Sequence, residues 1–148
     1  MTVLNVLQPE TPDSGTATKR AHADHRRIKL MLVEIEKLQD EEALLDKLES
    51  LADTLAEHFA FEESPLGYFA ELMESQPHVH SKIDRLRTQH SRIRSVADEL
   101  IQEARLRIER RREYERELAE LLHLIRAHER AEHRLAQDAM LIDIGVGD

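Results

Sequence analysis

Apolar residues recur at alternating steps of three and four along most of the chain, which is the spacing of one face of an amphipathic helix. Four such runs, called stripes below, can be traced between Ala21 and Ile142. The stripes are Ala21, His25, Ile28, Leu32 and Ile35; Leu44, Leu48, Leu51, Leu55, His58 and Glu62, continued by Leu66, Phe69 and Met73; Ile83, Leu86, His90, Ile93, Ala97, Leu100 and Ala104; and Tyr114, Leu118, Leu121, Ile125, His128, Glu132, Leu135, Ala139 and Ile142. They predict four amphipathic helices, each with one face toward a shared core.

Prolines and glycines divide the chain around these stripes. Prolines with Gly15 make residues 1–17 an expected N-terminal arm or loop. Pro65 should interrupt the second helix just after Glu62, and Pro77 should mark the next turn. Residues 18–144 are therefore predicted to form one all-α domain, an up-down-up-down antiparallel four-helix bundle.

Polar residues occupy core positions in every stripe. Each stripe contains one histidine, and the second and fourth also contain a glutamate one turn after it. In an up-down bundle, residues at one height are equidistant from the turn that joins their helices. The midpoints between these polar residues fall near residues 41–42, 76 and 109, all in polar segments. The six side chains can therefore form one inward-facing layer: His25, His58, Glu62, His90, His128 and Glu132.

Such a layer indicates a metal site. Two buried carboxylates without a stripe lysine or arginine would repel each other, and a cation removes that cost. Imidazole and carboxylate donors suit iron, manganese or zinc, but six donors exceed the needs of one tetrahedral zinc. Two metals fit if each takes two imidazoles while both carboxylates bridge. A bridging oxide or hydroxide then leaves one open position on each metal for a small ligand.

Composition narrows the class of protein. The chain has 148 residues, 34% of them charged and none of them cysteine, which excludes disulfides and thiolate metal sites. The net charge of −9 argues against nucleic-acid binding, and no apolar run is long enough to cross a membrane. Without a recognisable signal peptide, the expectation is a soluble, cytoplasmic protein, either monomeric or a homodimer.

The ordered set of His25, His58-x-x-x-Glu62, His90 and His128-x-x-x-Glu132 resembles the hemerythrin-like, or HHE cation-binding, domain family. The contexts "ADHRRI", "EHFAFEES", "LRTQHSRI" and "AHERAEH" are similar to its motifs, and the resemblance covers about residues 18–143. It implies a four-helix bundle with a non-haem di-iron centre. By resemblance, His25 and His58 serve one iron, His90 and His128 serve the other, and both glutamates bridge.

The chain departs from the family's oxygen carriers at two places. Those proteins have a further histidine one turn after the third-helix ligand, where this chain has Arg94, and their last ligand is an aspartate in HxxxxD instead of Glu132 in HxxxE. The pattern is closer to bacterial and regulatory relatives, which the family associates with iron or oxygen sensing and with peroxide or nitric oxide handling. Arg94 either contacts a carboxylate near the layer or extends into solvent.

Several assignments have alternatives. His22 competes with His25, His80 competes with His90, and Glu63 and Glu129 compete with their neighbouring glutamates, although each fits the stripes less well. The remaining histidines (His22, His78, His80, His123, His133) are expected on the surface, and Tyr114 is expected to pack in the core.

Three functions follow from the predicted site. The first is a di-iron protein that binds or senses dioxygen, peroxide or nitric oxide. The second is an enzyme that disproportionates peroxide in the manner of a catalase at the same centre, and the third is a bundle that stores metal without redox chemistry.

Overall fold

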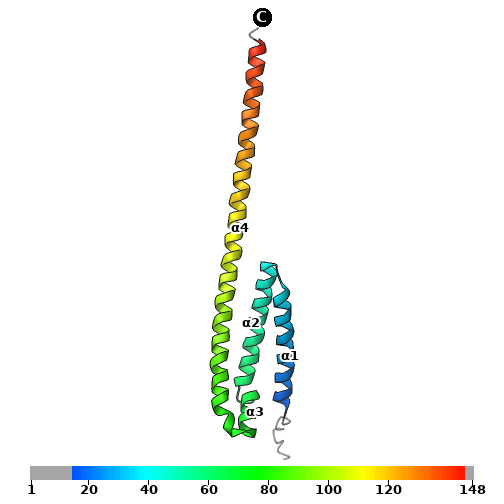
Figure 1. Cartoon of the computed structure of the whole chain (residues 1–148), viewed down its shortest axis with the longest axis vertical. Coiled ribbons are helices and arrows are strands. Elements are labelled where there is room, and N and C mark those ends of the chain that lie inside the picture. Colours follow the sequence, from blue (N-terminus) through cyan, green and yellow to red (C-terminus); the bar gives the residue numbers. More distant parts are fainter. Residues whose placement is uncertain (1–14, 146–148) are drawn as a thin grey trace, which may run out of the picture. The chain divides into compact units, whose positions relative to one another are not determined.

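The computed structural model describes residues 15–145 of the chain, and all the regular structure in this range is helical (Figure 1). The helices are α1 (Thr16–Lys37), α2 (Glu41–Glu63), α3 (Tyr68–Ser75), the short 3-10 helix η1 (Pro77–Val79) and α4 (His80–Gly145). The predicted all-α class is confirmed. Contacts between Cα atoms divide the chain into two compact units, one ending at Ala104 and one beginning at Arg105, and each is described by itself.

The N-terminal arm was predicted for residues 1–17, of which residues 1–14 lie outside the described part. Helix α1 begins at Thr16, two residues earlier than the predicted start of the domain. Gly15 precedes it with a φ of 111°, a left-handed conformation that glycine adopts without steric cost. None of the described helices is both long enough and apolar enough to span a membrane.

The first two predicted turns are confirmed, and side chains with turn chemistry mark both. Asp40 caps α2, since its carboxylate accepts a 2.8 Å hydrogen bond from the Ala43 amide. Helix α2 ends at Glu63, so the chain leaves the helix next to Pro65, and α3 then begins at Tyr68. The turn after α3 carries Pro77 at the start of η1.

The predicted turn near residue 109 is wrong. Helix α4 runs without interruption from His80 to Gly145, through the segment "LRIERRRE". This segment is made of residues with good helix propensity, and it contains no glycine, proline or small polar residue that would end a helix. Residue 109 is the midpoint between His90 and His128, but the chain does not turn there.

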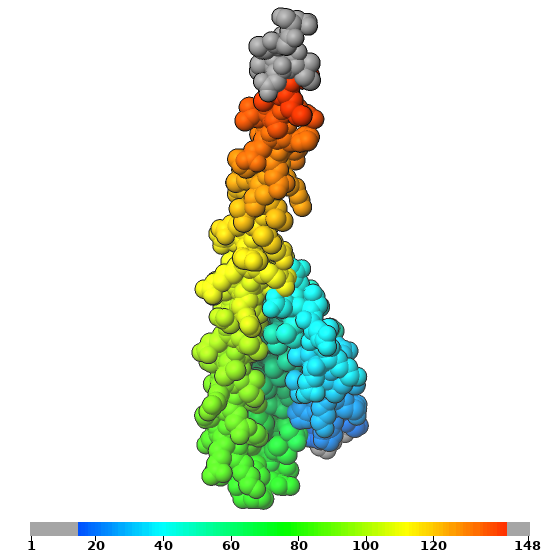
Figure 2. Space-filling view, turned by 45° about the horizontal axis from the view of Figure 1, so that its top comes forward, coloured from blue at the N-terminus to red at the C-terminus, as the bar shows by residue number. Residues whose placement is uncertain are grey.

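The first unit packs α1, α2, α3 and the part of α4 up to Ala104 against one another. Helices α1 and α2 run antiparallel on either side of the short connection, and the beginning of α4 lies on the α2 side of this pair (Figures 1 and 2). The buried apolar residues Phe59, Phe69 and Ile83 come from α2, α3 and α4. Thr18 of α1 donates a 2.7 Å hydrogen bond to Glu71, which ties α3 to the first helix. This part of the core therefore lies at the end of the unit where the stripe histidines were predicted.

The second unit consists of the remainder of α4. Within it, the members of the fourth stripe up to Ala139 are exposed, including Leu118, Leu121 and Ile125. The single helix visible in the yellow-to-red part of Figure 2 has no other described element of its own unit to cover it. Tyr114, expected in the core, is also exposed. Neither unit by itself contains all four stripes of the predicted bundle.

Candidate metal centre

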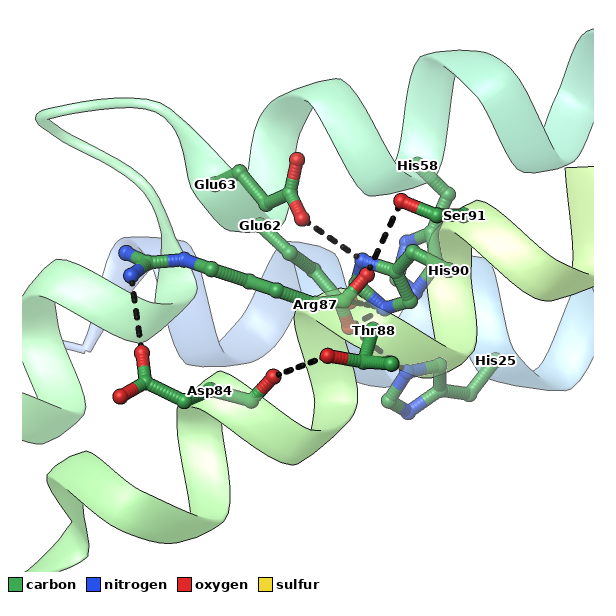
Figure 3. A network of polar contacts seen from close by, with 9 residues as sticks. All are labelled: His25, His58, Glu62, Glu63, Asp84, Arg87, Thr88, His90 and Ser91. Carbon is green, nitrogen blue, oxygen red and sulfur yellow. Dashed lines mark hydrogen bonds and ion pairs between the residues drawn. The ribbon is translucent and has the colours of Figure 1, made fainter.

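A buried carboxylate lies at the centre of the first unit, surrounded by three histidines. Glu62 is 4% exposed. Its Oε1 lies 2.8 Å from Nε2 of His58 and 3.3 Å from Nε2 of His25, and its Oε2 lies 3.1 Å from Nε2 of His90 (Figure 3). The structure thus brings together four of the six predicted ligands, and all three rings present the same nitrogen to the carboxylate.

Three helices supply these side chains, and their local sequence explains how. His58 and Glu62 are one turn apart on α2, so both lie on the face that their stripe directs inward. His25 comes from α1, across the antiparallel pair, and its ring meets the His58 ring edge-on at a centroid distance of 4.7 Å. His90 comes from α4. The predicted shared height of these positions is confirmed for the described residues of the first unit.

Two further carboxylates fix the orientation of the buried rings. Nδ1 of His58 lies 3.1 Å from Oδ2 of Asp24, and Nδ1 of His90 lies 3.2 Å from Oε1 of Glu63. An ionised carboxylate can only accept a hydrogen bond, so each Nδ1 carries a proton and donates it. In a neutral imidazole the other nitrogen, Nε2, then has a free lone pair. This is the tautomer that a metal ligand requires.

The arrangement suits a positive charge at its centre. With both Nδ1 atoms donating outward, two neutral rings would direct the lone pairs of Nε2 at Glu62 oxygens only 2.8 and 3.1 Å away. That is favourable only if the rings are protonated or if a cation lies between ring and carboxylate. The second condition suits the donors, because one donor atom from each of His25, His58 and Glu62 can be chosen so that all lie within 4.8 Å of one another. Atoms bound to a common ion at about 2.1 Å lie up to about 4.2 Å apart, so a small adjustment would close the group around it.

Aromatic rings cover one side of this group. The Phe59 ring stacks on the His90 ring at a centroid distance of 3.8 Å and an interplanar angle of 10°, and Phe69 is nearly parallel to the same ring at 5.6 Å. His25 differs, since 44% of its side chain is exposed. The site is therefore walled by apolar rings near His90 and open to solvent near His25.

His128 and Glu132, the other two predicted ligands, lie in the second unit. They contact each other, with Nε2 2.9 Å from Oε1, in the same i,i+4 arrangement as His58 and Glu62. Both side chains are exposed. Within their own unit the described residues offer no further ligand group for them, so their role in a metal site stays a prediction.

The alternatives named from the sequence can be placed as well. Glu63 contacts the outer nitrogen of His90 and does not point at the centre, which is a positioning role. His22 and His80 are exposed, as are His78, His123 and His133, so the expected surface location of these five is confirmed. Arg94 is also exposed.

Asp24 was missed by the sequence reasoning. It immediately precedes His25, but its partner is His58 on the next helix, and it also lies 3.9 Å from Nε of Arg20. Its position one residue before a stripe histidine was the only available signal. That signal does not reveal which ring the carboxylate contacts, because the contact is made between helices.

Comparison with known proteins gives one result. The family model described as the hemerythrin HHE cation binding domain matches residues 16–137, a range that contains all six predicted ligands. No curated protein and no solved structure gives a match.

Proposed function

The chain belongs to the hemerythrin HHE cation-binding domain family, and from this premise we propose that it is a non-haem di-iron protein that binds dioxygen, peroxide or nitric oxide. The match alone supports cation binding by this domain. The step to two irons rests on how the residues of the site are arranged.

The observation that supports two metals is that the two oxygens of Glu62 contact different histidines. Oε1 is shared by His25 and His58, whereas Oε2 faces His90. A carboxylate that binds a single ion does not need ligands sorted between its two oxygens. A carboxylate that bridges two ions does, because each oxygen then belongs to a different coordination sphere.

The residues that would hold the irons follow from this sorting. His25 and His58 would bind one ion and His90 the other, with Glu62 between them. His128 and Glu132 would complete the second ion and add a second bridge, as the family resemblance implies. When bound, the irons would supply redox activity and open positions for a small ligand.

The protein's own residues have distinct tasks in this proposal. Asp24 and Glu63 hold the Nδ1 protons, so that Nε2 of each ring stays available to the metal. The stacked rings of Phe59 and Phe69 exclude water beside His90. Glu62 offsets positive charge in a place where solvent does not.

The test is the metal content of aerobically purified protein together with its absorption spectrum. About two irons per chain and an oxo-to-iron charge-transfer band in the near ultraviolet would support the proposal, as would loss of this band in His58→Ala. One tightly bound zinc per chain would refute it. Oxygen release after addition of peroxide would separate a disproportionating enzyme from a protein that only binds its ligand.

A further inference from the structure

We propose that the metal centre is completed between two copies of this chain. In this arrangement residues 105–145 of one copy pack on the first unit of the second copy, where they deliver His128 and Glu132, and the exchange is reciprocal. The functional part of this proposal, a shared metal centre, rests on the function proposed above. Its structural content, a dimer that exchanges helices, can be tested without metal.

The first argument is the chemistry of the connection. The two confirmed turns contain an aspartate cap at Asp40 and a proline at Pro77, and Pro65 follows the end of α2. Between Asp98 and Asp138, in contrast, the chain has no glycine, proline, serine, threonine, asparagine or aspartate. Those residues are the ones that end helices and form tight turns. Nothing in this stretch favours a hairpin that would fold the fourth stripe back onto its own chain.

The second argument is that the first unit has an uncovered apolar face. Stripe positions that were predicted to be in the core are exposed on α1 and α4, namely Leu32, Leu86, Ile93 and Leu100, with fractions of 44%, 38%, 43% and 50%. On the same stripe of α4, Ile83 and His90 are buried. The first unit therefore buries part of each stripe and leaves a strip that a fourth helix would cover.

The third argument is that the second unit carries the matching face. In an antiparallel pair of helices centred on residue 109, Leu100 is level with Leu118 and Ile93 with Ile125. The same register continues along the two stripes and pairs Ala104 with Tyr114, Ala97 with Leu121, His90 with His128, Leu86 with Glu132, and Ile83 with Leu135. Every position of the third stripe finds a partner on the fourth.

This register can be satisfied by one chain or by two. A single chain would have to break α4 near residue 109, and the backbone groups released there would have no capping side chain. Two copies of a continuous helix, related by a two-fold axis near residue 109, make the same pairs twice without breaking either helix.

The site itself favours the same solution. Glu62 already has His25 and His58 on one oxygen, but only His90 on the other. The exposed His128–Glu132 pair would add one imidazole and one carboxylate on the side that lacks them. A second copy thus contributes ligands to a centre that the first unit alone leaves incomplete.

The absence of cysteine from the chain allows a direct test. The double variant Ile93→Cys/Ile125→Cys places two thiols at level positions of the proposed register. After mild oxidation, we expect a disulfide-linked dimer on a non-reducing gel and a dimeric mass in light scattering. The matched control replaces Ile125→Cys by Leu124→Cys, which lies off the stripe and should form little cross-linked dimer. A monomer with an internal disulfide would overturn the proposal, as would no disulfide at all.

Mixing of defective chains tests the shared site. His58→Ala and His128→Ala should each bind little iron alone. After the two are unfolded together and refolded, a heterodimer has one site with both defects and one site with neither, so about half of its sites should recover iron. No recovery, with wild-type protein loading iron normally, would overturn the proposal. If no protein binds iron but the thiol variant still yields the linked dimer, the helix exchange stands and the di-iron function fails.

A third variant tests the connection near residue 109. Replacing Glu109→Asn and Arg110→Gly introduces two residues that end helices and form turns, in a stretch that has none. We expect this variant to shift from dimer to monomer while it keeps its iron, since all ligands can then come from one chain. The control Glu109→Gln/Arg110→Gln should stay dimeric. If Glu109→Asn/Arg110→Gly contains the same fraction of dimer as the control, the connection does not determine whether the chain dimerises.

Discussion

Asp24 offers the sharpest test of how the site is built. Its Oδ2 accepts a 3.1 Å hydrogen bond from Nδ1 of His58, and its side chain is 28% exposed. The change Asp24→Asn keeps the size of the side chain and an oxygen that can accept the same hydrogen bond, but it removes the negative charge. Asp24→Ala removes the acceptor altogether. The two variants separate the charge of this group from its hydrogen bond.

The expected loss can be worked out from the type of bond. A hydrogen bond to a charged group contributes about 1.5–3 kcal/mol and a neutral one about 0.5–1.5 kcal/mol, so the difference is about 1–1.5 kcal/mol. Since about 1.4 kcal/mol corresponds to tenfold in affinity, Asp24→Asn should weaken iron binding by about tenfold. Asp24→Ala should approach the roughly 100-fold upper end seen when a carboxylate behind a metal-binding histidine is lost.

The assay is an anaerobic titration of the metal-free protein with ferrous iron against a competing chelator. The control is Asp53→Asn, an exposed aspartate on α2 outside the site, which should bind iron as the unaltered protein does. Circular dichroism at each step checks that the variants remain helical. If Asp24→Ala binds iron within about twofold of the unaltered protein, Asp24 does not fix the ring of His58, and the assignment of its tautomer is wrong.

The same titration distinguishes the two proposed ions. Glu63 holds His90 as Asp24 holds His58, but His90 faces the other oxygen of Glu62. Glu63→Gln should therefore weaken one binding step and Asp24→Asn the other. If both variants weaken a single step equally, the two oxygens do not serve separate ions.

Four further predictions concern stability and ligation. His58→Ala should lose most of the bound iron, whereas the surface variant His123→Ala should keep it, as measured by metal analysis of purified protein. Removal of the metal with a chelator should lower the Tm by about 5–10 °C. Metal at about 100 times its Kd stabilises the folded state by about 2.7 kcal/mol, and each kcal/mol is worth about 2–4 °C in a chain of this length. An unchanged Tm would contradict a stabilising metal. Gly67→Ala should lower the urea midpoint of unfolding, because a Cβ there would collide with the backbone oxygen of Phe61. Phe59→Ala should lower the free energy of unfolding by about 3–5 kcal/mol in the same measurement. If Phe59→Ala and the unaltered protein have equal midpoints, the stacked ring does not support the core.

The helices and the inward-facing ligands of the first unit could be predicted because they depend on local spacing. A histidine and a glutamate four apart on an apolar stripe must lie on one face of a helix, and burial of that face brings them inward. The confirmed turn at Asp40 and the end of α2 next to Pro65 are equally local, since a capping side chain or a missing backbone donor acts within a few residues. For these features the sequence contains the physical cause.

The positioning carboxylates could not be predicted in the same way. Asp24 and Glu63 lie beside stripe residues, off the stripe itself, and each contacts a ring on another helix. Whether such a group reaches a histidine depends on the rotation of one helix against its neighbour, which spacing along the chain does not contain. Composition offers no help either, because acidic residues are abundant throughout this chain.

The failed turn near residue 109 has a deeper cause. The third and fourth stripes are spaced symmetrically about residue 109, which predicts which of their residues share a level. The same pairs form when a helix folds back on its own chain and when it pairs with a second copy. Only the connecting residues distinguish the two, and in α4 these are leucine, isoleucine, arginine and glutamate, which continue a helix. The ligand pattern therefore predicts four helices around one layer without specifying how many chains supply them, and the absence of a helix-ending residue in the connection is the reason for proposing two.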